Sequence, residues 1–334
     1  MPNYVMDNEP VLLLKFNDHL CDLKSGIIYL SNIESFFNNG REKIKDENEG
    51  MIELFNGERI TYKEIINQYK ELCQCYISSF TALYKDDFCS DGRIKTMVIN
   101  NILNLEVPGE EETRGCIIYD YSKIKNLFNF NFVYPYTVEF MHKEIKKPSI
   151  SDNSQEFYLF NYQNFISKIA NGLVELKDKG IFHEMKYFLK SSDQNMNSIV
   201  KLALQKMGYI EKKEDFIEMT YKADKVVYED FYKQEKTKDE ILKDLSNCNN
   251  DMKIYENYLS KALFTKKSKY STQNEYRILV TQFSREKSRF ANSLKLNYSY
   301  NINSYNNSIY MVINPTNKCK TIQKQLSEFK IINL

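Results

Sequence analysis

The stretch from Lys266 to Val280, KKSKYSTQNEYRILV, is a basic, polar lead-in that runs directly into a short apolar strand. Within this strand Glu275 and Arg277 are two residues apart, and side chains at that spacing point to the same face of a sheet. Burying a carboxylate and a guanidinium together is costly unless each has a partner or a substrate. The pair therefore marks a core strand and is the best single lead to a functional site.

Composition places the chain among globular proteins. Its 334 residues suit one large domain or two smaller ones, and 42 % apolar with 27 % charged residues allow a core to form. Lys and Arg together number 46, and Asp and Glu number 45. Such a balance gives no overall field that would steer the chain toward nucleic acid or acidic lipid, and it leaves room for a local basic patch.

Cysteine usage and the N-terminal sequence indicate a cytoplasmic protein. Seven cysteines are scattered, and Cys73 with Cys75 forms the only close pair, which predicts reduced thiols and no zinc site. Val11 to Leu14 is a four-residue apolar run, too short to cross a membrane, and no signal-peptide pattern precedes it. We expect no metal ion and no membrane partner.

Apolar runs between polar turns predict most of the strands. The expected strands are 11–16, 27–30, 73–81, 115–120, 132–140, 225–228, 271–281 and 308–313. Asn56-Gly57 between two further short runs is typical of a hairpin turn. No regular alternation of strand and helix follows, so a doubly wound parallel sheet is disfavoured.

Helical patterns predict where helices interrupt this sheet. Two helical stripes lie within 155–215, a capping box at Thr237 and Glu240 opens a long helix toward Leu263, and a terminal helix covers 317–329. We therefore expect an α+β fold: a mixed, mainly antiparallel sheet with flanking helices and a helical insertion. Its parts are a strand-rich 1–150, the insertion at 155–215 and the rest of the core at 216–334.

Several familiar kinds of site have no sequence signature here. The chain contains neither a P-loop nor a G-x-G-x-x-G pattern, and its three histidines lack metal-ligand spacing. The acidic residues Asp46, Glu47 and Glu49 allow a metal-dependent nuclease as a third function class. The alternative is a solvated loop balanced by the neighbouring lysines and arginine, which is the commoner reason for such a charge run.

Three interpretations of Glu275 and Arg277 stay open at this level. The pair is an ion pair that fixes sheet register, or Glu275 is a catalytic carboxylate that stabilises a cationic transition state. In the third interpretation Arg277 binds a phosphate or carboxylate group, which suits the two-pronged guanidinium.

A series of motifs, in the same order along the chain, resembles the signature of a large uncharacterised family of bacteria and phages. The motifs are Gly26–Ser31, Phe36–Asn38, Asp46–Gly50, Cys75–Phe80, Gly115–Asp120, Val226–Tyr228 and Lys266–Arg277. The chain departs from the family where Tyr270 replaces the usual Trp and where Gln273 replaces the first Glu of E-x-E. Because genes of this family often lie among defence and mobile-element genes, the resemblance implies an intracellular effector or anti-defence protein of phage–bacterium conflict.

The spacing of Gln273 and Glu275 also resembles the Q-x-E pattern of ADP-ribosyltransferases. That resemblance implies NAD as a substrate, with Glu275, Gln273 and the strand serine Ser31 as catalytic residues. Lys15 stands on the first strand, where those enzymes carry an Arg or His that holds NAD. The implied activity is a NAD- or nucleotide-directed transferase or glycohydrolase in which Glu275 stabilises positive charge on the ribose.

The alternative is a non-enzymatic binding protein. It would recognise a nucleotide, a nucleic acid or a protein partner in a basic cleft lined by Arg277, Lys266, Lys267 and Lys269. Binding to phosphates would weaken steeply with salt, whereas covalent chemistry would leave a product.

Overall fold

The computed structural model describes residues 9–17, 20–24, 26–38, 49–68, 72–106, 115–128, 133–136, 155–159, 218–230, 236–247, 252–284, 293–297, 309–313 and 319–331. Its strands are β1 Leu12–Asn17, β2 Ile27–Asn32, β3 Met51–Glu53, β4 Arg59–Thr61, β5 Leu72–Leu83, β6 Gly115–Asp120, β7 Val133–Tyr136, β8 Gln155–Leu159, β9 Glu218–Lys225, β10 Val227–Tyr228, β11 Thr265–Lys266, β12 Glu275–Ser284, β13 Ser293–Asn297 and β14 Ile309–Ile313. Its helices are α1 Leu20–Lys24, α2 Ile33–Asn38, α3 Tyr62–Asn67, α4 Thr96–Glu106, α5 Tyr121–Phe128, α9 Lys238–Asn247, α10 Met252–Phe264 and α12 Cys319–Glu328, with short 3-10 helices η1 Lys85–Asp87 and η3 Ser268–Gln273.

The long strand β5 organises the main sheet. The strand order is β14-β6-β1-β5-β2-β13-β8-β7, and β12 and then β9 extend the sheet from β5. All pairings within this sheet are antiparallel except that of β13 with β8, so the fold is α+β with a mixed, mainly antiparallel sheet, as the sequence predicts.

The sheet forks along one edge of β5. At one end of β5, β1 pairs with Thr81 to Leu83, and further along β2 pairs with Tyr76 and Ile77. Strand β12 pairs with β5 from Leu72 to Thr81. Thr81 pairs with β1 as well as with β12, and Ile77 pairs with β2 as well as with β12, so β12 lies on the opposite edge of β5. The arms led by β1 and β2 therefore separate at residues 78–80.

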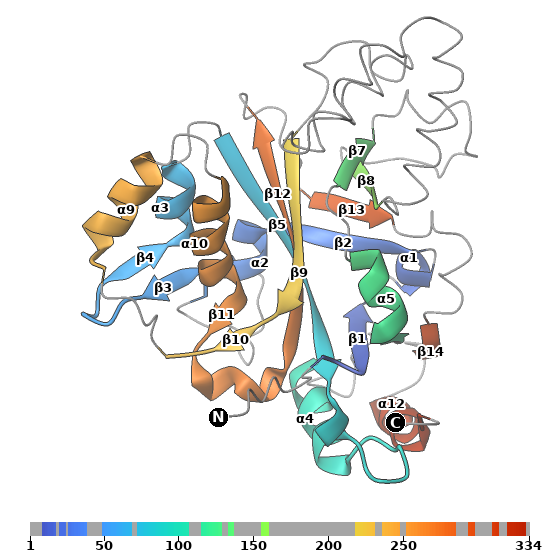
Figure 1. Ribbon diagram of the computed structural model, residues 1–334. Helices are drawn as coiled ribbons and strands as arrows, with labels where there is room; N and C mark the ends of the chain where they lie inside the picture. The colour runs from blue at the N-terminus through green and yellow to red at the C-terminus, as the bar shows by residue number, and fades with distance from the viewer. Residues whose placement is uncertain are drawn as a thin grey trace, which may run out of the picture.

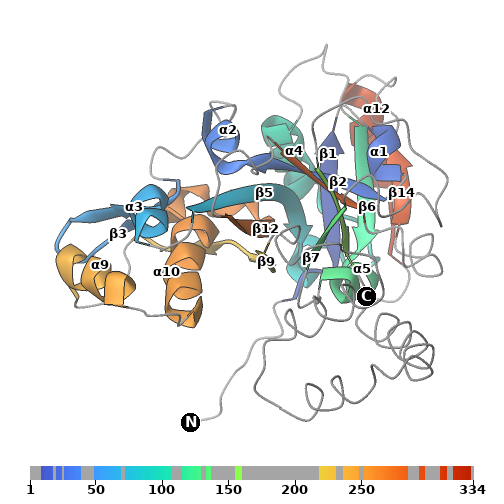
Figure 2. The same cartoon turned by 90° about the horizontal axis from the view of Figure 1, so that it is seen from above.

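Side-chain alternation sends each strand's apolar residues to two different layers. In β12, Tyr276, Ile278 and Val280 join the core on one face, which includes residues of α1 and α5. On the other face Leu279 joins a cluster with α3, α9 and α10, while Leu83 at the end of β5 joins a separate cluster with α4 and α12. Figures 1 and 2 both show these two helical groups apart from each other.

Local sequence signals explain several element ends. Ile52 pairs with Ile60 across the turn at Gly57, which has φ +83°, so the predicted hairpin is confirmed. The Thr237 backbone N–H donates to Glu240 Oε2 at 2.8 Å, and the Glu240 N–H donates to Thr237 Oγ1 at 3.4 Å, which confirms the predicted capping box. The long helix predicted from it is described as α9 and α10, and residues 248–251 lie outside the described residues.

The predicted helical insertion falls mostly on residues that the structure does not describe. Its first residues form β8, which pairs in parallel with β13 and in antiparallel with β7, so 155–159 belong to the sheet. Residues 160–215 lie outside the described ranges.

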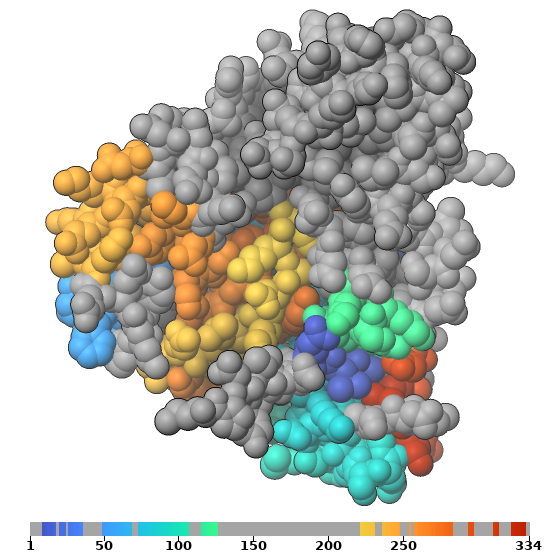
Figure 3. Space-filling view, viewed as in Figure 1, coloured from blue at the N-terminus to red at the C-terminus, as the bar shows by residue number. Residues whose placement is uncertain are grey.

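Strand β9 is visible at the surface in Figure 3 as a yellow band between α10 in orange and α5 in green. Its described pairing is with β12, and Lys222, Asp224 and Lys225 are exposed along it. Charged side chains on a strand at the edge of a sheet oppose pairing with other chains. None of the helices in the described ranges is long and apolar enough to cross a membrane.

Candidate functional site

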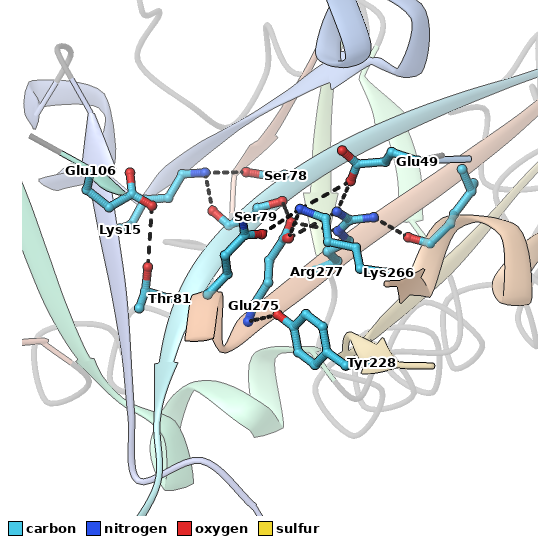
Figure 4. Close-up of polar contacts among 12 residues, drawn as sticks. Lys15, Glu49, Ser78, Ser79, Thr81, Glu106, Tyr228, Lys266, Glu275 and Arg277 are labelled. Carbon is cyan, nitrogen blue, oxygen red and sulfur yellow. Dashed lines mark hydrogen bonds and ion pairs between the residues drawn. The ribbon is translucent and has the colours of Figure 1, made fainter. Parts of the chain in front are cut away.

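The fork of the sheet holds a polar cluster between two apolar clusters on the same face of β5. Ser79 and Thr81 of β5 lie on the same face as Ile77 and Leu83, which belong to the separate clusters under α10 and α4. Glu275 pairs with Thr81 and Arg277 pairs with Ser79, so the side chains of Glu275 and Arg277 point into the space between these two apolar clusters. Figure 4 shows Ser79, Glu275 and Arg277 converging there, while Thr81 turns toward Glu106.

Glu275 is buried, and each of its two carboxylate oxygens accepts two hydrogen bonds. Oε1 accepts from Arg277 Nε at 2.6 Å and from the Ser79 hydroxyl, while Oε2 accepts from Lys266 Nζ at 2.8 Å and from Arg277 Nη2 at 3.0 Å. Two donors on each oxygen fill the acceptor capacity of a carboxylate. Ser79 supplies the only neutral donor among these four contacts, so it is the group that a ligand hydroxyl could replace without exposing a charge.

Arg277 is fully buried, with 0 % of its side chain exposed. Its Nη1 donates to the Leu263 carbonyl at 2.5 Å, and Nη2 also forms a short contact with Glu49. Arg277 thus joins β12 to α10 and to the residues that precede β3. Such a guanidinium acts as the centre of an ion network inside the protein.

Lys266 completes a balanced set of charges. Its Nζ lies 3.5 Å from Glu49 Oε1 and donates to Gln273 Oε1 at 2.8 Å, in addition to Glu275. Two cations therefore face two carboxylates, and all four side chains are 8 % exposed or less. Balance of this kind is what makes burial of four charges tolerable.

The charges set the protonation of the cluster. Burial alone would raise the pKa of Glu275, but the nearby Arg277 and Lys266 outweigh it and hold that pKa well below the usual glutamate range. Burial would lower the pKa of Arg277, and Glu275 and Glu49 together raise it above the usual value instead. Glu275 is consequently ionised throughout the physiological pH range.

An unusual backbone turn delivers Gln273 and Glu275 to the site. Asn274 has φ 45° and ψ 53°, a left-handed conformation that Asn adopts more readily than most residues. It ends η3, and its carbonyl accepts from the Ala82 N–H at 2.6 Å. The expected strand 271–281 therefore begins at Glu275, and Gln273 reaches Lys266 from a turn. Backbone of this kind is often found where a site imposes a geometry.

Lys15 lies at the fork itself. Its Nζ donates to Ser78 Oγ at 2.8 Å and to the Ser79 carbonyl at 2.6 Å, where the arms led by β1 and β2 have separated. Lys15 directly follows Leu14, the last residue of β1 that pairs with β5. Its ammonium thus satisfies the Ser79 carbonyl, which lies where neither β1 nor β2 pairs with β5 in the described residues. It approaches Glu275 through Ser79.

The other predicted residues lie further away. Ser31 is exposed and pairs with Ile77, four residues along β5 from the Thr81 partner of Glu275, or about 13 Å at the usual rise of a strand. Lys267 Nζ lies 2.8 Å from Glu53 Oε2, and exposed Lys269 stacks its ammonium on the Tyr270 ring at 4.9 Å. The structure brings together Glu275, Gln273, Arg277 and Lys15, and does not place these three beside them.

Sequence reasoning missed the roles of Glu49, Ser79 and Tyr228. The Tyr228 hydroxyl accepts from the Glu275 backbone N–H at 2.9 Å, and burial together with the charge of Glu275 raises its pKa. The sequence predicts for Glu49 either a metal site with Asp46 and Glu47 or a solvated charged loop, and Asp46 and Glu47 lie outside the described residues. In the described part of the chain no three His, Cys, Asp or Glu side chains gather to hold a metal.

Comparison with known proteins identifies no relative. No protein-family model, curated protein or solved structure matches the chain. The chemistry of the cluster is therefore the basis for a functional proposal.

Proposed function

We propose that this chain is a cytoplasmic NAD- or nucleotide-directed transferase or glycohydrolase that uses the carboxylate of Glu275. The observation that carries the proposal is a buried carboxylate at the fork of a sheet, held by Arg277, Lys266 and Ser79, with cationic neighbours that lower its pKa. Cleavage of the bond between ribose and nicotinamide builds positive charge on the sugar. A fixed anion in a low-dielectric site stabilises such charge more strongly than water does.

The reaction needs no metal and no histidine. The ribose C1′–N bond breaks, and its electron pair leaves with neutral nicotinamide. Water or a target hydroxyl forms the new C1′–O bond and releases its proton to solvent. A ribose hydroxyl that takes the place of the Ser79 hydroxyl would bring the developing charge next to Glu275 Oε1.

The alternative, a binding protein with a basic cleft, has less support. Arg277 and Lys266 are paired with carboxylates, and Lys267 contacts Glu53 and the Asp230 carbonyl. A phosphate would have to displace these carboxylates from their cations, whereas a ribose hydroxyl at Glu275 has to displace only the neutral Ser79 hydroxyl. The role in phage–bacterium conflict is a proposal that rests on the sequence resemblance.

The test is release of nicotinamide from NAD by the wild-type protein and by Glu275→Gln. We expect at least a hundredfold lower rate in the variant, about the loss of one oxyanion-type interaction. Glu53→Gln is the matched control, because Glu53 is also a partly buried carboxylate paired with a lysine on a neighbouring element.

Loss of folding is separated from loss of chemistry by a second variant. Glu275→Gln with Lys266→Gln restores charge balance around Arg277 and Glu49, and its fold is checked by circular dichroism. If this double variant is folded and releases nicotinamide at the wild-type rate, the proposal is wrong. Absence of release and of labelled target in the wild type would equally refute it.

A further inference from the structure

Glu49 uses its two carboxylate oxygens differently. Oε1 lies in contact with Arg277 Nη2 and 3.5 Å from Lys266 Nζ. Oε2 receives no hydrogen bond or ion pair from the described residues. Glu275 has donors on both oxygens, so within the described cluster Glu49 is the carboxylate that has acceptor capacity to spare.

The open oxygen of Glu49 is not sealed inside the protein. The Glu49 side chain keeps 8 % of its surface exposed, and the residue as a whole is only partly buried. Gln273 has a similar pattern of contacts: its Oε1 accepts from Lys266, and its Nε2 donates to none of the described residues.

Glu49 Oε2 and Gln273 Nε2 belong to side chains that both contact the ammonium group of Lys266. Glu49 Oε1 and Gln273 Oε1 are 3.5 and 2.8 Å from Lys266 Nζ, so their unused atoms flank Lys266 beside Glu275. One is an anionic acceptor and the other a neutral donor. A group that both donates and accepts, such as a sugar hydroxyl, matches this pair, whereas a phosphate would meet the charge of Glu49.

We propose that Glu49 Oε2 is the hydrogen-bond acceptor that selects a hydroxyl-bearing ligand at the Glu275 site. The inference rests on the proposed NAD-directed function and adds a specificity-determining residue to it. Glu49 contacts the ligand, and Arg277 and Lys266 hold the other oxygen so that Oε2 faces outward.

The substitution Glu49→Gln tests this geometry directly. The amide oxygen of the new side chain must face Arg277 and Lys266, because an amide NH₂ there would meet two donors. The amide NH₂ then stands where Oε2 stood. An acceptor becomes a donor at nearly constant shape, and because one negative charge of the cluster is also lost, the fold of the variant is checked by circular dichroism.

The experiment measures kcat and KM for nicotinamide release from NAD, and Kd for the non-reacting probe ADP-ribose by calorimetry. For Glu49→Gln the inference predicts that KM and Kd rise roughly ten- to a hundredfold, the loss expected for a hydrogen bond to a charged group, while kcat changes less. Glu53→Gln should leave all three constants within about twofold of wild type.

The outcomes separate the inference from the function on which it rests. If the wild type releases nicotinamide and Glu275→Gln does not, yet Glu49→Gln keeps wild-type KM and Kd, only the role of Glu49 is overturned. If the wild type neither cleaves NAD nor binds ADP-ribose, the proposed function and this inference are both overturned. A fall in kcat alone in Glu49→Gln would also contradict a binding role.

Discussion

Replacing the charges at the centre of the cluster should produce strongly non-additive changes in stability. Glu275→Leu leaves two buried cations facing Glu49 alone, and Arg277→Met leaves two carboxylates facing Lys266 alone. Removing one partner of a buried ion pair costs about 3–5 kcal/mol, so each single variant should lose about that much free energy of unfolding.

The double variant should be less damaged than either single one. With both residues replaced, Glu49 and Lys266 still balance each other at 3.5 Å. The remaining loss is that of the Leu263 carbonyl, which Arg277 Nη1 had satisfied, and of the Ser79 hydroxyl, which had donated to Glu275. An unsatisfied buried polar group costs about 1–3 kcal/mol, and Ser79 can turn to other acceptors, so we expect a total loss near that range.

Urea unfolding followed by circular dichroism measures the wild type, the two single variants and the double variant.

The same measurement at different pH values tests the charge state of Glu275, because the pKa of Glu275 is lower in the folded than in the unfolded protein. Its stabilising contribution is then complete above the unfolded value of about 4.3 and is lost as pH falls below it. Wild type should weaken below about pH 4.3, and the double variant should show a smaller acid effect. Single variants that each lose less than about 1 kcal/mol, or a double variant that loses their sum, would refute the reasoning.

Three further changes test backbone and packing features of the fold by thermal and urea unfolding. Asn274→Gly should be nearly neutral because Gly accepts φ 45°, whereas Asn274→Val should lose about 1–3 kcal/mol; equal effects would contradict a backbone constraint at this turn. Gly92→Ala should lose at least about 1 kcal/mol, since Gly92 has φ +83° and a Cβ would collide with the Ile331 carbonyl oxygen; an unchanged midpoint would mean that this contact yields freely. Tyr221→Phe should be neutral or up to about 1 kcal/mol stabilising because its buried hydroxyl has no hydrogen-bond partner among the described residues, and a clear loss would reveal a partner for that hydroxyl.

Much of the sheet could be predicted from local patterns. The predicted 115–120 matches β6 at both ends, and 27–30 and 308–313 overlap β2 and β14, because short apolar runs bounded by polar turns indicate buried strands. The pattern could not show that β5 carries two arms on one edge. That fork depends on pairings between segments more than forty residues apart, such as Leu14 with Thr81 and Ser31 with Ile77.

The candidate site was predicted in part. The spacing of Glu275 and Arg277 identified two side chains on one face, and their ion pair at 2.6 Å confirms that they meet. A place for Ser31 in the site was predicted from a resemblance. The pairing register instead places Ser31 opposite Ile77 of β5, four residues from the Thr81 partner of Glu275. Glu49 carried no signal as a partner of Arg277, since contact across 228 positions of sequence arises from the tertiary fold alone.

The pH dependence of nicotinamide release tests the central claim most directly. Single-turnover release from NAD, measured for folded wild type and for folded Glu275→Gln with Lys266→Gln between pH 5 and pH 8, follows the one charge that the proposal requires. Because the pKa of Glu275 lies well below this range, the account predicts a wild-type rate that Glu275 protonation does not lower at pH 5, and a rate at least about a hundredfold slower in the variant throughout. Equal rates in the two proteins, or no release from the wild type at any pH, would contradict it.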